Sequence, residues 1–396
     1  MDKKKTNFQK LDQKYYLPTF NRFPITLIKG KGSRVWDDKG NEYIDAMAGI
    51  AVNSVGHCHP RVVEAIQRQA EDLIHISNFY LSKPQALLAE KLATISGLNR
   101  VFFANSGAEA NEGAIKLARK YAHKHNRGGT VIGFSGCFHG RTLATIAMGK
   151  KKMQEGFEPI PHGFNMIPFN DMKAIKEAVN EEVAAFIIEP VQGEGGIHIA
   201  DKPFMKELRD ICNKENILLI FDEIQCGMGR TGKYFAKEHY GVQPDILTSA
   251  KALGSGVPIS AIITNQKVSD VIGFGDHGTT FGGNPLATAA ALAAIEVIED
   301  EELIKQAAEK GEWMRSQILE NNPKTYGIKE VRGLGLMIGI ELEFEAKPVV
   351  SKMLEKGVLA NATADTVLRF VPPLNITYNE LKTVLDVMYQ SLEESK

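Results

Sequence analysis

A lysine and an aspartate that each follow an apolar stretch are the side chains of this sequence best placed for chemistry. Lys251 stands between a short apolar run and the glycine-rich segment 254–258. A lysine removed from water has a lowered pKa and can attack a carbonyl carbon to form a Schiff base, whereas a solvated loop lysine is the bland alternative. Asp222 closes the stretch 217–221, where a buried carboxylate would face a ligand at the end of a strand.

The glycine-rich stretch after Asp222 indicates a second chemistry, because Gly227–Lys233 resembles the loop that binds nucleoside triphosphates. That loop needs a hydroxyl group directly after its lysine to hold magnesium, and the phenol Tyr234 takes this place. Asp222 and Glu223 also come before the glycines, on the wrong side for such a loop. We therefore disfavour a nucleoside triphosphatase. Only a demonstration of magnesium-dependent ATP binding would bring this hypothesis back.

A candidate anion site lies at Ser106, Gly107 and Ala108, between a predicted strand and a predicted helix. Free backbone N–H groups and the helix dipole favour a phosphate there, although simple N-capping explains the same serine. The segment 57–59, His-Cys-His, offers metal-binding side chains, but adjacent residues cannot easily converge on one ion. No metal site is predicted.

Together these residues match the needs of one cofactor, pyridoxal 5′-phosphate. It requires an amine for its aldehyde, a carboxylate beside its ring nitrogen, a cradle for its phosphate and apolar groups against its ring. Lys251, Asp222 and the segment 106–108 are candidates for the first three. The carboxylate would keep the ring nitrogen protonated, and the protonated ring would stabilise a carbanion of the substrate.

Alternating strands and helices must position these residues. Apolar periodicity predicts helices at 61–72, 84–95, 108–123, 172–180 and 203–215, and strands at 101–104, 130–134, 184–188 and 217–221. Such alternation predicts an α/β fold with a mostly parallel central sheet covered by helices. After a long helix from about Pro285, strands at 327–332 and 336–342 indicate a smaller α+β domain, with a boundary near residue 300.

Bulk composition sets the limits on function. With 396 residues, 43% of them hydrophobic, the chain is long enough for two or three domains. Its 47 basic and 48 acidic side chains argue against a nucleic acid or a membrane surface as partner. Four cysteines without C-x-x-C spacing fit a reducing cytoplasm, and no apolar run is long enough to cross a bilayer. The basic start, residues 1–10, is interpreted as a solvated tail.

Eight motifs follow one another along nearly the whole chain. They are Gly56-His-Cys-His-Pro60, Asn105-Ser-Gly-Ala-Glu-Ala-Asn111, Phe138-His-Gly-Arg141, Glu189-Pro-Val-Gln-Gly-Glu-Gly-Gly196, Phe221-Asp-Glu-Ile-Gln225 with Gly227-Met-Gly-Arg-Thr-Gly232, Lys251, Thr280-Phe-Gly-Gly-Asn-Pro285 and Leu368-Arg-Phe-Val-Pro-Pro373. In this order they resemble a class III, fold-type I pyridoxal-phosphate aminotransferase of the acetylornithine/ornithine group. The resemblance implies a large cofactor-binding domain at 59–299, a small domain at 300–396, and an N-terminal segment, 1–58, that packs with the small domain.

The resemblance also implies roles around the cofactor ring. Lys251 would form the Schiff base and, once substrate has released it, would carry the proton that moves during amino transfer. Asp222 would hold the ring nitrogen, and Gln225 would bond to the phenolic oxygen. Phe138 would stack on one face of the ring, and Ile224 would contact the other.

Further implied roles concern the phosphate and the subunit partner. Ser106, Gly107 and Ala108 would cradle the phosphate. Thr280 would reach the phosphate in the neighbouring subunit, so the resemblance implies a homodimer with shared active sites. Glu189 and Arg230 are interpreted as supports of the loops around the cofactor, not as proton carriers.

Two arginines are expected to bind the carboxylates of two amino donors, because a guanidinium fork binds both oxygens in one plane. By resemblance, Arg141 would bind the α-carboxylate of an N-acylated ornithine or the side-chain carboxylate of glutamate. Arg369 would bind the α-carboxylate of glutamate, and Glu194 would pair with Arg369 until glutamate arrives. Without the resemblance, a surface ion pair for Arg369 with Glu194 and a solvated loop role for Arg141 would be the simpler interpretations.

The expected reaction passes the δ-amino group of N-acetylornithine, or of another N-acylornithine, to 2-oxoglutarate, giving a semialdehyde and glutamate in arginine biosynthesis. Free ornithine, 4-aminobutyrate and N-succinyl-diaminopimelate are the rival donors, and acetyl and succinyl groups are not distinguished. Phe20 stands where relatives that act on ornithine generally have a substrate-binding tyrosine, which favours an N-acylated substrate. A catalytically silent regulator that binds the cofactor is a further rival, but the chain shows no DNA-binding module.

Overall fold

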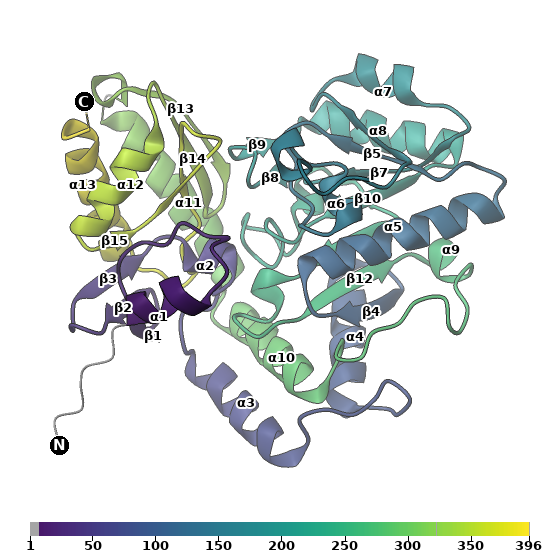
Figure 1. The fold of residues 1–396 in the computed structure, drawn as a ribbon, viewed down its shortest axis with the longest axis horizontal. Coiled ribbons are helices and arrows are strands. Elements are labelled where there is room, and N and C mark those ends of the chain that lie inside the picture. The colour runs from purple at the N-terminus through teal and green to yellow at the C-terminus, as the bar shows by residue number, and fades with distance from the viewer. Residues whose placement is uncertain (1–7, 322, 396) are drawn as a thin grey trace.

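A seven-stranded sheet forms the centre of the computed structural model, which describes residues 8–321 and 323–395 (Figure 1). Its strands follow the order β4 (Arg100–Ala104), β12 (Ser260–Thr264), β11 (Ile246–Ser249), β10 (Leu218–Asp222), β7 (Val183–Ile188), β5 (Thr130–Phe134) and β6 (Phe164–Ile167). Neighbouring strands are parallel, except that β12 runs antiparallel to β11 and β4. The prediction of a mostly parallel sheet is confirmed.

Helices cover both faces of this sheet, because its strands send alternate apolar side chains into two cores. α5 (Gly107–Lys124) packs on the face that receives Ala185 and Ile187 of β7. α8 (Lys202–Glu215) packs on the face that receives Phe186 and Ile188, beside α7 (Met172–Ala178). All six residues of β7 are buried, which explains its continuous apolar sequence.

Three further helices cover the β4–β12 end of the sheet, on the face opposite α5. They are α3 (Pro60–Asp72), α4 (Lys83–Ser96) and α10 (Pro285–Asp300), and α10 contacts both of the others. The side chains of β12 point alternately to the two faces of the sheet. Ile262 belongs to the core with α5, whereas Ala261 and Ile263 belong to the core with α4 and α10. The predicted helices at 61–72 and 84–95 agree with α3 and α4.

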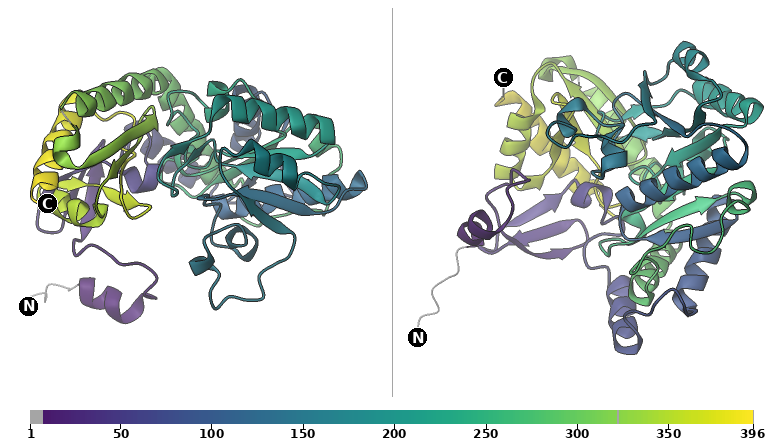
Figure 2. Two further views of the ribbon diagram at one scale, coloured as in Figure 1. Left: turned by 90° about the horizontal axis from the view of Figure 1, so that it is seen from above. Right: turned by 45° about the vertical axis from the view of Figure 1, so that its right-hand side comes forward.

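Two four-stranded sheets lie beside the large one (Figure 2). The first is antiparallel, in the order β13 (Ile328–Leu334), β14 (Met337–Leu342), β17 (Val367–Phe370) and β16 (Asn361–Thr363). The second runs β1 (Leu27–Lys31), β2 (Arg34–Asp37), β3 (Glu42–Asp45) and β15 (Val358–Leu359), with β15 parallel to β3. Strands from the beginning and from near the end of the chain therefore share one sheet. The boundaries at residues 58 and 299 stay predictions.

Helices and short elements complete the chain. α11 (Leu303–Glu320) contacts β13 and β14, and α12 (Ala346–Glu355) contacts α13 (Tyr378–Glu393), β15, β16 and β17. The short elements are α1 (Phe8–Tyr15), α2 (Ala48–Ala51), α6 (Leu143–Ile146), α9 (Gln266–Ser269), the pair β8 (Val191–Gln192) and β9 (His198–Ile199), and the 3-10 turns η1 (Lys151–Met153), η2 (Ala236–His239), η3 (Lys251–Leu253) and η4 (Pro323–Tyr326).

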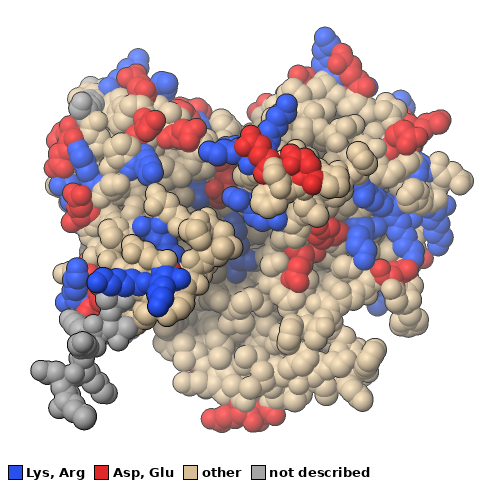
Figure 3. Space-filling model, in the orientation of Figure 1, with Lys and Arg blue, Asp and Glu red and all other residues tan. Residues whose placement is uncertain are grey.

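The surface carries charges of both signs. Figure 3 shows Lys, Arg, Asp and Glu mixed over the two lobes, and a broad area without them over the region of α3 and α10. Among the described residues, no helix has both the length and the apolar character that crossing a bilayer demands.

Candidate active site

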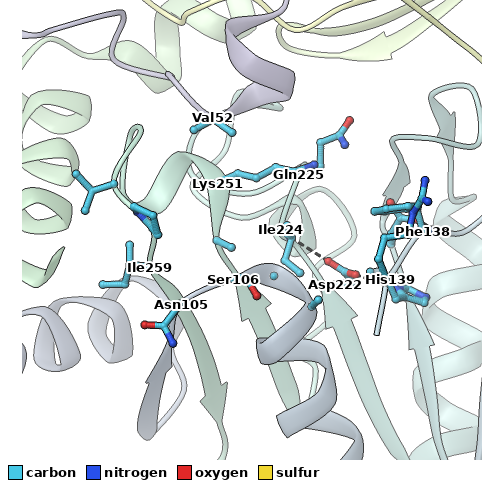
Figure 4. A pocket seen from close by; sticks show the side chains of 18 of the residues that line it. Val52, Asn105, Ser106, Phe138, His139, Asp222, Ile224, Gln225, Lys251 and Ile259 are labelled. Carbon is cyan, nitrogen blue, oxygen red and sulfur yellow. Dashed lines mark hydrogen bonds and ion pairs between the residues drawn. The ribbon is translucent and has the colours of Figure 1, made fainter. Parts of the chain in front are cut away.

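Nine of the predicted site residues line one cavity of about 440 Å³ at the carboxyl edge of the large sheet (Figure 4). They are Ser106, Gly107, Ala108, Phe138, Arg141, Asp222, Ile224, Gln225 and Lys251. The chain reaches these residues from the ends of four strands, namely β4, β5, β10 and β11. Convergence of loops at the carboxyl ends of strands is the usual origin of a ligand site in such a sheet.

Asp222 is the last residue of β10 and is held by three donors. His139 Nδ1 and Asn111 Nδ2 each lie 2.7 Å from its Oδ2, and the N–H of Ile224 lies 3.1 Å from its Oδ1. The Thr248 hydroxyl donates to Asn111 Oδ1 at 2.8 Å and so fixes the orientation of that amide. The carboxylate, only 2% exposed, is therefore locked in place at the cavity wall.

His139 and Asn111 are functional candidates that sequence reasoning missed. Both lie inside motifs that it singled out, but neither was given a role. Burial opposes the charged imidazole, yet Cys137 and Asp222 raise the pKa of His139 well above its usual value. His139 Nδ1 faces Asp222, so a protonated imidazole would add charge to this hydrogen bond.

Lys251 follows β11 and begins η3 with a left-handed backbone, φ +46°. A non-glycine residue in this region is strained, and such strain gathers at functional sites. Burial lowers the pKa of Lys251, against the opposing charge of Glu194, and Arg369 lowers it further. A lowered pKa increases the neutral fraction of the amine, which is the form that attacks a carbonyl carbon.

The segment 106–108 begins α5 and fits both interpretations of its sequence, a helix N-cap and an anion site. The Ser106 side chain caps α5 by accepting the N–H of Glu109 at 3.3 Å, and the segment also lines the cavity. A Cβ atom at Gly107 would come within 2.9 Å of Ile224 Cδ1. A residue larger than glycine would therefore crowd Ile224 at this part of the cavity. The space beside a free helix N-terminus suits a phosphate.

Phe138, Ile224 and Gln225 complete the cavity wall (Figure 4). The Arg141 guanidinium lies over the Phe138 ring, 5.4 Å from its centre. A buried amine, a fixed carboxylate, a helix N-terminus and apolar groups therefore meet at one cavity, and this set fits the pyridoxal phosphate that the sequence predicted.

Glu194 and Arg369 lie behind Gln225. Arg369 Nη1 is 2.6 Å from Glu194 Oε1 and 3.1 Å from Gln225 Oε1, and Gln225 Nε2 is 3.3 Å from the same Glu194 oxygen. Although burial opposes it, the Arg369 charge holds the pKa of Glu194 below its usual value. The alternative of a surface ion pair is wrong, because Arg369 has no exposed surface.

Two more of the predicted site residues do not line this cavity in the single chain. Thr280 is exposed in the loop before α10. Phe20 is 71% exposed and lies among residues of the N-terminal segment. Their roles stay predictions.

The other residues that the sequence singled out have partners of their own. Glu189 accepts backbone N–H groups beside the cavity, whereas Arg230 is buried and donates to the carbonyls of Leu336 and Pro372. Tyr234 bonds to Glu299 through its hydroxyl. Within the described ranges, no group of three or more His, Cys, Asp or Glu side chains could hold a metal ion.

Comparison with known proteins gives concordant matches over nearly the whole chain. The model of the class-III aminotransferase family matches residues 15–392. An acetylornithine aminotransferase from Methanocaldococcus jannaschii is 57% identical, with 98% of this chain and 99% of that protein covered. One from Nitrosomonas europaea is 45% identical, with 94% and 95% covered.

Solved structures are similar over the same length. The ornithine aminotransferase from Toxoplasma gondii ME49 has a TM-score of 0.94 at 38% identity, covering 98% of this chain and 96% of that one. The acetylornithine aminotransferase from Elizabethkingia anophelis has a TM-score of 0.87 at 35% identity, covering 98% of both chains.

Proposed function

Because this chain belongs to the class-III aminotransferases, we propose that it transfers the δ-amino group of N-acetylornithine, or of another N-acylornithine, to 2-oxoglutarate. The products are the semialdehyde and glutamate, and the reaction serves arginine biosynthesis. The observation that carries the proposal is the buried Arg369–Glu194 pair beside the cavity that Lys251 and Asp222 line. Relatives at 57% and 49% identity are acetylornithine aminotransferases, which supports the acylated donor.

The cofactor is pyridoxal 5′-phosphate, whose protonated ring accepts electrons from the carbon that carries the amino group. Lys251 would hold the aldehyde group of the cofactor and, once free, its amine would carry the proton that moves during amino transfer. Asp222 would lie beside the ring nitrogen and favour its protonated form. Support for this pair comes from the lowered pKa of Lys251 and the three donors that orient Asp222.

The remaining cavity residues hold the cofactor in one orientation. Phe138 and Ile224 would contact the two faces of the ring, and Gln225 would donate a hydrogen bond to its phenolic oxygen. The segment 106–108 binds the phosphate through backbone N–H groups at the start of α5. All of these residues line the same cavity.

The two arginines bind substrate carboxylates in turn. Arg141 binds the α-carboxylate of the acylated ornithine, and its exposed position gives it access to solvent and substrate. Arg369 stays paired with Glu194 while N-acetylornithine is bound, since this donor offers no second carboxylate. When glutamate binds, its α-carboxylate replaces Glu194 at Arg369, so one cavity accepts both donors.

The active unit is a homodimer in the cytoplasm. Thr280 is exposed and does not line its own cavity, which fits a contact with the phosphate of a partner subunit. Leu73, Ile74 and Leu81 add exposed apolar surface, and Figure 3 shows a broad uncharged area over α3 and α10. All four cysteines are free, as expected in a reducing compartment.

Free ornithine is the second candidate donor, favoured by the TM-score of 0.94 to an ornithine aminotransferase. We rank it lower because that protein is 38% identical, against 57% for the acetylornithine aminotransferase from Methanocaldococcus jannaschii.

Absorbance spectroscopy of the purified holoenzyme tests the proposal. The protein is titrated separately with N-acetylornithine, N-succinylornithine, ornithine, 4-aminobutyrate, N-succinyl-diaminopimelate and glutamate. Conversion of the lysine-bound cofactor to its amine form by an acylated ornithine and by glutamate is expected. A response to free ornithine or 4-aminobutyrate in place of the acylated donors would reassign the substrate, and a protein that binds no cofactor would refute the reaction.

A further inference from the structure

Glu189 is a buried carboxylate at the cavity wall to which the proposed reaction gives no role. It follows β7, is 5% exposed and lines the cavity. Its Oε2 accepts the N–H of Phe138 at 2.9 Å, and its Oε1 accepts the N–H of Gly193 at 3.2 Å. One side chain therefore fixes two loops relative to each other.

These two loops carry the proposed binding sites for both substrate carboxylates. Phe138 belongs to the first loop, which follows β5, and its ring lies under the Arg141 guanidinium. Gly193 belongs to the second loop, where its carbonyl accepts a bond from Arg369 Nη1 at 3.1 Å and the next residue is Glu194.

The second loop packs so closely on its neighbours that a small shift of its backbone would disturb them. A Cβ atom at Gly193 would come within 2.2 Å of Gln225 Oε1, which shows how closely the backbone approaches that side chain. Because Gln225 also bonds to Arg369 and Glu194, a shift of Gly193 would disturb the whole group.

We infer that Glu189 is a positioning residue that sets the separation of the two loops, and through them the alignment of both amino donors with the cofactor. The inference rests on the proposed function, because it takes Arg141 and Arg369 as the carboxylate sites. A carboxylate suits this task because its two oxygens accept two N–H groups, whereas a carboxamide has one oxygen to accept and places N–H groups against the second donor. Burial, with Asp222 in the same direction, raises the pKa of Glu189 to about 7.

The test is the Glu189→Gln holoenzyme, assayed for KM and kcat with N-acetylornithine and, in the reverse direction, with glutamate. Loss of one buried hydrogen bond should raise both KM values about tenfold, with a smaller change in kcat. The absorption band of the lysine-bound cofactor should persist, because Lys251 itself is not replaced. A purely structural role would lower the melting temperature and leave both KM values as they were.

Glu223→Gln is the matched control. Glu223 is 1% exposed, and its carboxylate accepts the N–H groups of Ala236 and Lys237 at 2.5 and 2.8 Å. Burial raises the pKa of Glu223 to about 7 as well, but the residue does not line the cavity. Its variant should lose thermal stability and keep both KM values.

Three results would overturn the inference. They are unchanged KM values in Glu189→Gln, equal KM increases in Glu223→Gln, and rapid hydrogen exchange of the Phe138 or Gly193 amide in the wild-type holoenzyme. The exchange measurement decides the matter if the Glu189→Gln protein does not fold. Failure of the wild type to convert any acylated ornithine would instead refute the proposed substrate, and the glutamate assay would still test Glu189.

Discussion

The proposed cofactor site and the proposed substrate site are built in different ways. On the cofactor side, Asp222 and Lys251 follow neighbouring strands of one sheet, and hydrogen bonds within that sheet and its helices orient the carboxylate. On the substrate side, Arg369 comes from β17 of a separate sheet, Arg141 is exposed, and Phe20 belongs to an exposed terminal segment. The cofactor site therefore depends on one folded core, whereas the substrate site depends on how several parts of the chain meet.

Lys251→Ala should have the largest effect on activity, because it removes the central residue of the proposed cofactor site. Transamination should fall by about 10³-fold or more, because the covalent anchor and the proton carrier are lost together. Absorbance spectroscopy with added pyridoxal phosphate should show no lysine-bound band, and a persistent band would contradict the role. Lys310→Ala is the matched control, since Lys310 is 5% exposed and bonds to Gln306 and Leu374 outside the cavity.

Asp222→Asn should have the next largest effect. A neutral amide no longer stabilises the protonated ring nitrogen, so kcat should fall about 10²- to 10³-fold while the lysine-bound band persists. Steady-state kinetics with saturating donors measures this change. Asp245→Asn provides the control, because Asp245 is buried against Arg209 and Lys267 away from the cavity. An equal loss of kcat in the control would mean that any buried aspartate of the sheet is needed.

Glu194→Gln should change the preference between the two amino donors and leave cofactor binding as it is. Without the paired charge, Arg369 is free for the α-carboxylate of glutamate, so the kcat/KM of glutamate should rise about tenfold relative to that of N-acetylornithine. Parallel assays of the two half-reactions give this ratio. Glu341→Gln removes a similar partner, 2.7 Å from Arg332, and should leave the ratio unchanged. A falling ratio in Glu194→Gln would contradict the exchange of carboxylates at Arg369.

The same contrast explains which elements could be predicted from the sequence. β7 is predicted at 184–188 and spans Val183–Ile188, because a strand buried on both faces is continuously apolar. β1 was not predicted, since four of its five residues are exposed and give no apolar pattern. β15 has two residues and pairs with β3, so its existence depends on a distant segment.

Site residues, like strands, could be predicted only where the sequence carries a local signal. Residues at strand ends could be identified because each has a local signal, such as Asp222 after an apolar run. The contacts of Asp222 with His139 and Asn111 join three distant positions, so no local pattern contains them. The burial of Arg369 likewise depends on the position of β17 between β14 and β16.

Phe20→Tyr should have the smallest effect on activity, and it tests how the proposed substrate site selects its donor. The added hydroxyl could bond to the free α-amino or carboxylate group of ornithine, so kcat/KM for ornithine should rise about fivefold, with no gain on N-acetylornithine. Competition assays with both donors measure the change. Phe23→Tyr is the control, because Phe23 lines the same N-terminal groove as Phe20 but also lines a second, apolar pocket with Val350 and Leu354 of α12. No gain on ornithine, or an equal gain in both variants, would show that Phe20 does not select the acylated donor.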